Sequence, residues 1–139
     1  MEIRKATIAD YDRLVALDTV AASDVARRNQ LKAWIEAGTC HVAEIDRSPA
    51  AYGVLTYHFF GNGFIEMLTV GERFRRHGIG RALVQHFKAT CTSPKLFTTT
   101  NQSNQAMQAL LLTAGFRRSG FIENLDENDP EMVFFVLLP

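Results

Sequence analysis

The sequence predicts a mixed α/β fold in which about seven mostly antiparallel strands form a central sheet with about four helices on its faces. Three observations support this fold class. Alternating apolar and polar residues indicate strands in both halves of the chain, and other segments have apolar residues at helical spacing. A helical segment beginning at Gly78 also connects two strands as a crossover. No repeat, low-complexity tract or linker interrupts this order, so we expect residues 1–139 to form a single domain.

The first half of the chain predicts a strand, two helices and then three consecutive strands. Residues 2–7 (EIRKAT) alternate as a strand, and Thr7 followed by Asp10 matches a capping box that opens a helix. A second helix over QLKAWIEAG ends at Gly38, since glycine commonly caps helix C-termini. Turn residues separate the next strands, which predicts an antiparallel meander of TCHVAEI, AAYGVLTYHFF and FIEMLTV.

The second half predicts a crossover helix, a further helix and two closing strands. The helix from Gly78 carries Ile79, Leu83 and Phe87 on one stripe, and the strand KLFTTT follows it. Apolar residues at helical spacing then indicate a helix that ends at Gly115. The closing strands are FRRSGFI and MVFFVLL.

Composition excludes several functional classes. Fifteen basic and fifteen acidic side chains cancel, which argues against a nucleic-acid-binding surface. The apolar run over residues 132–138 is too short to span a bilayer, and no secretory signal is visible, so we expect a cytoplasmic protein without membrane contact. The two cysteines are far apart, and the histidines lack ligand spacing, so we expect no metal.

The stretch RRHGIGRALV, residues 75–84, carries the most specific chemical signal. Glycine inside a helix costs roughly 0.5 to 1 kcal/mol relative to alanine, so Gly78 and Gly80 indicate a need for bare backbone. A helix N-terminus has free N–H groups that bind anions, and Arg75, Arg76 and Arg81 add positive charge. The stretch therefore predicts a pyrophosphate-binding loop, although it is neither a Walker loop nor a dinucleotide fingerprint.

The setting of this loop makes the signal more specific. The motif Arg75-x-x-Gly78-x-Gly80 follows the strand FIEMLTV and opens a helix, and here the sequence resembles the GNAT superfamily of acyl-CoA-dependent N-acetyltransferases. The segment NQAMQALLLTAGF, from Asn104 to Phe116, is similar to a later helix of that family. The order of elements is similar over the whole chain. The resemblance implies a GNAT-like fold and acetyl-CoA as co-substrate.

The resemblance also implies which residues bind acetyl-CoA. The backbone of Leu68, Thr69 and Val70 would pair with the pantetheine arm, and Asn104 would reach the arm from the other side. Arg75 precedes the loop and adds charge. The residues implied to hold the pyrophosphate, largely through main-chain N–H groups, are Arg76, His77, Gly78, Ile79, Gly80 and Arg81. We also expect valine at position 80 to obstruct the phosphates while leaving the fold intact.

The acid and base of the reaction are less evident. Glu66, flanked by Ile65 and Met67, is our candidate base, and the alternative is a solvated residue on the open face of the strand. Some family members have a glutamate where this sequence has Thr99, so that base is absent. Family members often have a tyrosine proton donor seven residues after the asparagine, where this sequence has Leu111. Water or a nearby hydroxyl would then protonate the thiolate.

The leading hypothesis is an enzyme that transfers an acetyl group from acetyl-CoA to a primary amine of a small molecule or peptide by direct attack in a ternary complex. The alternative, favoured by Leu111, is a catalytically weakened or inactive acyl-CoA-binding module that acts as a sensor or partner subunit.

Neutral net charge disfavours RNA binding. The sequence is compatible with a homodimer. An acidic cluster either attracts a cationic amine or is a solvated turn; it contains Glu123, Asp126, Glu127 and Asp129.

Overall fold

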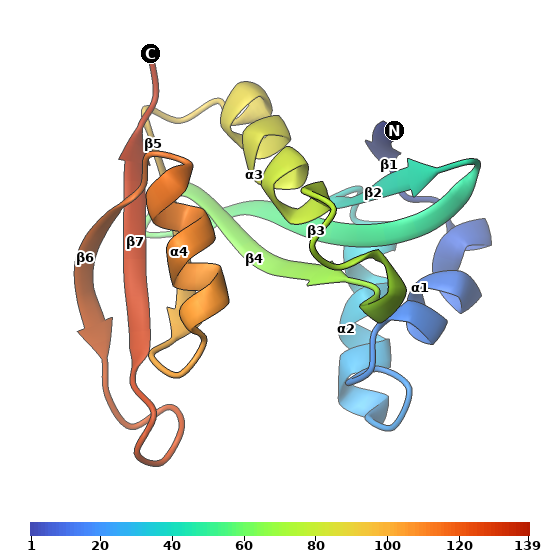
Figure 1. Ribbon diagram of the computed structural model, residues 1–139, viewed down its shortest axis with the longest axis horizontal. Coiled ribbons are helices and arrows are strands. Elements are labelled where there is room, and N and C mark those ends of the chain that lie inside the picture. Colours follow the sequence, from blue (N-terminus) through green and yellow to red (C-terminus); the bar gives the residue numbers. More distant parts are fainter.

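A computed structural model of the chain describes residues 1–139, which form a seven-stranded sheet with helices on both faces (Figure 1). The strand order is β1-β2-β3-β4-β5-β7-β6, and every neighbouring pair is antiparallel except β4 and β5. The strands are β1 (Glu2–Lys5), β2 (Cys40–Ile45), β3 (Ser48–Phe59), β4 (Asn62–Val70), β5 (Lys95–Asn101), β6 (Arg117–Ile122) and β7 (Glu131–Leu137). The predicted fold class is confirmed.

Four α-helices cover the sheet, two on each face (Figure 1). They are α1 (Tyr11–Leu17), α2 (Val25–Glu36), α3 (Ile79–Thr90) and α4 (Gln105–Thr113). Two short 3₁₀ turns, η1 (Ile8–Asp10) and η2 (Glu72–Phe74), precede α1 and α3. None of the helices has the length and apolar character needed to cross a membrane.

Each face of the sheet has its own apolar core, which follows from the alternation of side chains along the strands. On one face Leu14 of α1 and Leu31 of α2 pack with Val42 and Val54. On the other face the residues of α3 and α4 pack against β3, β4 and β7, among them Leu83, Phe87, Leu111, Leu55, Ile65 and Phe134. We call these the α1/α2 face and the α3/α4 face.

Strands β4 and β5 separate after a short parallel contact. They pair only from Gly63–Ile65 to Leu96–Thr98, and the Thr98 hydroxyl donates to the Ile65 carbonyl at 3.0 Å. Beyond this point β4 stays paired with β3 as far as Val70, while its other edge has no strand partner. The backbone groups on that edge are therefore available to a ligand.

Several predicted boundaries differ from the structure; the largest difference is that α2 begins at Val25, five residues before the predicted QLKAWIEAG. The Thr7 and Asp10 capping box opens η1, which continues into α1, and the Asp10 carboxylate also pairs with Arg4 of β1 at 2.8 Å. The last strand begins at Glu131, one residue earlier than the run MVFFVLL indicated. This earlier start of β7 brings a carboxylate into the sheet.

Candidate active site

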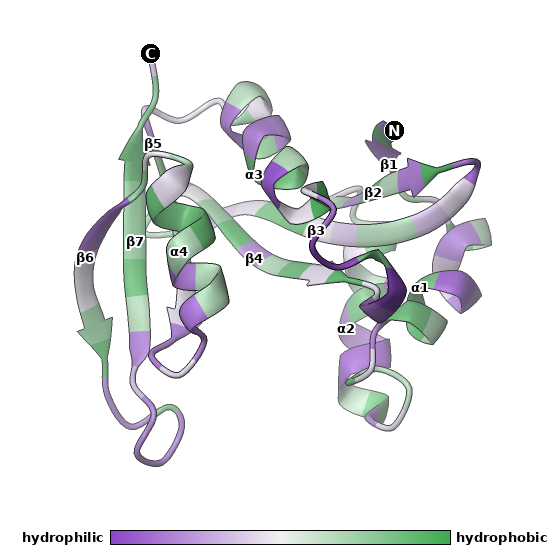
Figure 2. Cartoon of the chain, in the orientation of Figure 1, coloured by the Kyte–Doolittle hydropathy of each residue, from purple (hydrophilic) through white to green (hydrophobic).

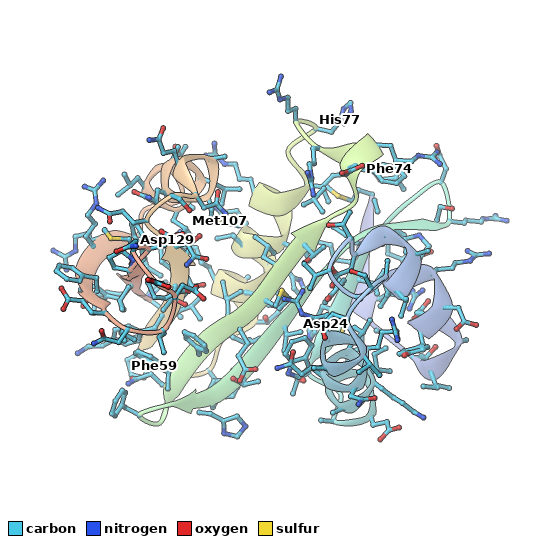
Figure 3. All side chains as sticks on the ribbon, turned by 90° about the horizontal axis from the view of Figure 1, so that it is seen from below. Asp24, Phe59, Phe74, His77, Met107 and Asp129 are labelled. Atoms are coloured by element: carbon cyan, nitrogen blue, oxygen red, sulfur yellow. The ribbon has the colours of Figure 1, made fainter.

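Two adjoining cavities lie where β4 and β5 separate, with volumes of about 460 and 290 Å³. The two cavities share a wall of four residues: Arg27, Leu68, Asn104 and Met107. Met107 is labelled in Figure 3, where α4 faces the long strands. A separate cavity of about 540 Å³ lies between α1, the start of β3 and η2, and it contains none of the predicted site residues.

The larger of the two adjoining cavities holds residues predicted to contact the pantetheine arm. Leu68, Thr69 and Val70 line it from β4, along the strand edge that lacks a partner. Asn104 lines it from the start of α4, where its Oδ1 accepts from the Met107 N–H at 3.1 Å and caps the helix. Its amide NH₂ stays free to donate to a ligand. Extended amide chains suit this arrangement of backbone edge and side-chain donor.

The loop predicted to bind the pyrophosphate lies between β4 and α3, in a mostly hydrophilic segment (Figure 2). Arg76 and Gly78 both adopt left-handed backbone conformations, with φ of 67° and 77°. The N–H groups of Arg76, His77 and Gly78 donate to no protein acceptor, and those of the first turn of α3 are free by helix geometry. Such a run of unpaired N–H groups fits a diphosphate.

The charged side chains around the loop point into different environments. The Arg75 Nε donates to the Val70 carbonyl at 3.2 Å, which ties the loop to the end of β4, and Arg75 also lines the larger cavity. Arg76, His77 and Arg81 are exposed, and His77 is labelled at the outer end of the loop in Figure 3. Their side chains are therefore free to meet phosphate oxygens.

The two glycines of the motif are needed for different structural reasons. Gly78 has open space around it but needs the left-handed backbone that starts the helix. Gly80 is buried, and a Cβ there would lie 3.3 Å from a methyl group of Leu110 and 3.5 Å from one of Val70. Valine at position 80 would therefore crowd the packing of α3 against α4, contrary to our expectation that the fold would tolerate it.

Glu66 lies in the smaller cavity on a β-bulge of β4. The register with β3 shifts at this point, so Ile65 pairs with Leu55, Met67 pairs with Val54, and Glu66 has no partner across the strands. Its half-buried carboxylate accepts a hydrogen bond from the Thr56 hydroxyl at 2.9 Å on the α1/α2 face. A carboxylate so positioned can take a proton from a group entering the cavity.

A second carboxylate enters the smaller cavity from β7. Glu131 Oε2 accepts a hydrogen bond from the Thr99 hydroxyl at 2.8 Å, and both residues line the cavity with Glu66. The sequence analysis missed Glu131, although it alternates with Val133 and Phe135 and so shares a face with them. Position 99 itself has no acid, but Glu131 of the neighbouring strand β7 places a carboxylate beside it.

The comparisons with known proteins agree with the fold. Residues 9–116 match the Acetyltransferase (GNAT) family. The chain is 33% identical to a GNAT acetyltransferase of Bacillus cereus, with a TM-score of 0.92 over 99% of this chain and 97% of that one.

The chain belongs to the GNAT acetyltransferase family.

Members of this family are acetyl-CoA-dependent acyltransferases, and more distant structures share the fold. A ribosomal-protein-alanine N-acetyltransferase from Brucella melitensis is 22% identical, with a TM-score of 0.80 over 99% of this chain and 100% of that one. A Bacillus anthracis protein described as a streptothricin acetyltransferase was solved in complex with acetyl coenzyme A. It is 20% identical, with a TM-score of 0.66 over 72% of this chain and 62% of that one. No curated protein matches the sequence.

In this GNAT acetyltransferase Leu111 belongs to both the core and the cavity. Its side chain is 1% exposed and packs with the core of the α3/α4 face, yet it lines the smaller cavity. Leucine donates no proton. The nearby Thr100 is 7% exposed, also lines the cavity, and makes no side-chain hydrogen bond within the protein, so its hydroxyl is free to donate to a ligand.

A buried polar network holds Arg27 at the junction of the two cavities. The Arg27 Nη1 donates to Asp18 Oδ2 at 3.1 Å, and the Tyr52 hydroxyl donates to the same oxygen. Burial alone would raise the pKa of Asp18, but hydrogen bonds from Tyr52, the Ala21 N–H and Arg27 lower it overall. Sequence analysis missed this network because its members lie on different elements: Asp18 directly follows α1, Arg27 lies on α2, and Tyr52 lies on β3.

The acidic cluster between β6 and β7 has a partly structural role. Asp126 accepts from the Asn101 amide at 2.8 Å, and Asp129, labelled in Figure 3, accepts from the Ser103 N–H and hydroxyl at 3.0 and 2.7 Å. These bonds fasten the loop to the end of β5. Glu123 and Glu127 remain exposed, so only part of the cluster is free to attract a cation.

Proposed function

We propose that this GNAT acetyltransferase transfers the acetyl group of acetyl-CoA to a primary amine of a small molecule or peptide by direct attack in a ternary complex. The observation that carries the proposal is that the two cavities adjoin and share four lining residues. One lies against the start of α3, with its unpaired N–H groups, and the other contains Glu66 and Glu131. All seven strands belong to one sheet, which supports a single domain over residues 1–139.

Acetyl-CoA is bound, in this proposal, by the residues that line the larger cavity and the loop. The free N–H groups from Arg76 to Arg81 hold the two phosphates, and the exposed arginines add charge. The unpaired edge of β4 at Leu68 to Val70 pairs with the amides of the arm, and Asn104 donates from α4. The thioester then lies at the junction near Leu68.

The amine approaches from the α1/α2 face, where both carboxylates lie. Glu66, directly or through water, takes one proton from the ammonium form of the acceptor. The amine nitrogen bonds to the thioester carbonyl carbon while N–H groups of β4 near Leu68 stabilise the oxyanion. The C–S bond then breaks, and the remaining ammonium proton passes to the thiolate, with Thr100 or water as donor. The products are the amide, the coenzyme A thiol and the proton held by Glu66.

A second candidate function is an acyl-CoA-binding module with weak or no catalysis. The specific observation that favours it is Leu111, which places an aliphatic side chain where many family members have a tyrosine. Such a module would act as a sensor or partner subunit and would bind acetyl-CoA without consuming it.

Free thiol release separates the two functions. The purified protein is mixed with acetyl-CoA and a panel of primary amines, and the thiol and the acetylated amine are both quantified. We expect release with at least one amine, a large loss in Glu66→Gln, and no change in Glu36→Gln, an exposed residue at the end of α2. Acetyl-CoA binding without thiol release from any amine would support the binding module instead.

A further inference from the structure

A row of four phenylalanines lies on the α1/α2 face of the sheet; we call it the phenylalanine row, and it contains Phe59, Phe64, Phe97 and Phe135. Phe64 of β4 pairs with Phe97 of β5, which pairs with Phe135 of β7. The Phe97 and Phe135 rings stack with centroids 5.7 Å apart, and Phe59 stacks on Phe64 at 4.8 Å. The strand register thus aligns the rings of Phe64, Phe97 and Phe135 across β4, β5 and β7, and Phe59 of β3 extends this line.

The row is not part of either apolar core. All four rings are half-buried, and none belongs to the buried clusters beneath the helices. On this face α1 packs against β3 and α2 against β2, so the helices cover the other half of the sheet. Figure 3 shows Phe59 at the β3–β4 hairpin, well separated from Asp24 at the start of α2. The far end of the row is closed by Arg117, whose guanidinium lies 5.0 Å from the Phe135 centroid.

The row runs beside the two carboxylates of the active site. Glu66 follows Phe64 by two residues on β4, and Thr99, which holds Glu131, follows Phe97 by two residues on β5. Residues two apart on a strand share a face and lie about 7 Å apart along it. A ligand that places an ammonium group at the carboxylates can therefore extend its other end over the rings.

We infer that the acceptor is a primary amine carrying an aromatic or similarly planar apolar group on a short alkyl linker, which stacks on the phenylalanine row. This inference rests on the proposed function, since it names the substrate class of the same site. Rings prefer offset or edge-on contact with other rings, and such contacts add to the burial of apolar surface. The acidic side chains bind the ammonium end, so the two ends of the site differ in chemistry.

The size of the row favours a small ligand over a second copy of the chain. Four half-buried rings together expose at most roughly 300 Å². A stable interface between two proteins buries about 800 Å² on each partner. The row is therefore too small for such an interface by itself but large enough for one aromatic group.

Calorimetry on the protein saturated with coenzyme A tests this recognition separately from catalysis. The probes are phenethylamine, ethylamine, putrescine and an alanyl peptide. We expect phenethylamine to bind at least about tenfold more tightly than ethylamine, and Phe97→Leu to weaken phenethylamine alone by about 3- to 10-fold. Phe121→Leu is the matched control, because Phe121 pairs with Met132 and lies on the α3/α4 face. If Phe97→Leu does not fold, Phe59→Leu replaces it.

The outcomes distinguish this inference from the proposed function. Equal affinities for the four probes, or an unchanged phenethylamine affinity in the row variants, would overturn the inference even if thiol release continued. A wild-type dimer that Phe97→Leu converts to a monomer in light scattering would assign the row to a second copy and overturn it as well. Row-dependent phenethylamine binding without thiol release would support the inference and count against the proposed acetyl transfer.

Discussion

Thr99 of β5 donates a hydrogen bond from its hydroxyl to the carboxylate of Glu131 on β7, at 2.8 Å. This bond holds the Glu131 carboxylate beside position 99 of β5, where the chain has no acid of its own. With Glu66 in the same cavity, the acceptor side of the site has two carboxylates on the α1/α2 face. These two acids have different roles in the proposed reaction: Glu66 is the base, and Glu131 binds the amine.

Glu66→Gln should lower kcat strongly while leaving acetyl-CoA affinity unchanged. Removing a positioned base costs roughly 10² to 10⁴ in rate. The amide can still accept the hydrogen bond that the Thr56 hydroxyl donates, so the bulge of β4 is retained. Single-turnover rates and a thermal-shift titration with acetyl-CoA measure the two quantities; a normal rate at every pH would assign the base elsewhere.

Glu131→Gln should act mainly on amine binding. A hydrogen bond to a charged group contributes about 1.5 to 3 kcal/mol, so KM for the amine should rise about tenfold or more with a smaller change in kcat. Thr99→Val should have a weaker effect of the same kind, and Thr99→Ser, which keeps the hydroxyl, serves as its control. A fall in kcat alone would contradict a binding role for Glu131.

Replacing the exposed arginines of the loop should weaken acetyl-CoA binding. The double variant Arg76→Gln/Arg81→Gln removes two donors to phosphate and should raise Kd about tenfold or more, with a reduced dependence on salt. Arg118→Gln on the exposed strand β6 is the control for loss of a surface arginine away from the loop. Equal Kd values in the double variant and the wild type would show that the phosphates lie elsewhere.

Leu111→Tyr should raise the rate of thiol release with the same amine. A phenol in the cavity supplies the missing proton donor, while the larger side chain costs roughly 1 to 3 kcal/mol of stability at this buried position. In the wild type Thr100→Val should slow release, and in the tyrosine variant the same change should matter less. Urea midpoints measured in parallel separate a loss of fold from a loss of rate.

The pair His41 and His86 should make the protein less stable in mild acid. Their Nδ1 and Nε2 atoms lie 2.8 Å apart, so one ring donates and the other accepts. Burial, aided by the charges of His86 and Lys5, lowers the pKa of His41 to about 4, and burial lowers the pKa of His86. Unfolded imidazoles titrate near 6.5 and take up protons that the folded pair does not.

The free energy of unfolding should therefore fall as pH decreases from about 6.5 toward about 4, by on the order of 1 to 3 kcal/mol. His41→Gln should flatten this decline, which urea unfolding at a series of pH values measures. The lowered pKa values of Asp10 and Asp18 contribute a separate loss at lower pH, when these carboxylates become protonated. An equal slope in the wild type and His41→Gln would exclude the histidine pair as the cause.

Local signals in the sequence predicted the fold and the position of the loop before α3. Gly78 and the flanking arginines lie within a few residues of one another, and a free helix N-terminus is a local property. The order of helices and strands followed from hydrophobic periodicity for the same reason. The sequence predicted a need for glycine at position 80 but not its packing role, since the close approach to Leu110 depends on how α4 packs.

Long-range pairing explains what the sequence could not predict. Glu131 reaches Thr99, and Arg27 reaches Asp18 and through it Tyr52, only because the sheet order and the helix positions bring them together. The phenylalanine row likewise depends on β7 inserting between β5 and β6. Alternation along each strand is visible in the sequence, but the neighbours of that strand are not.

The most direct test of the account is a matrix of initial rates for thiol release, with acetyl-CoA and the best amine of the panel both varied. Direct attack in a ternary complex predicts double-reciprocal lines that intersect, with one acetylated amine formed for each thiol released. Parallel lines, which are typical of a covalent acetyl-enzyme, or the absence of thiol release from a protein that binds acetyl-CoA, would contradict it.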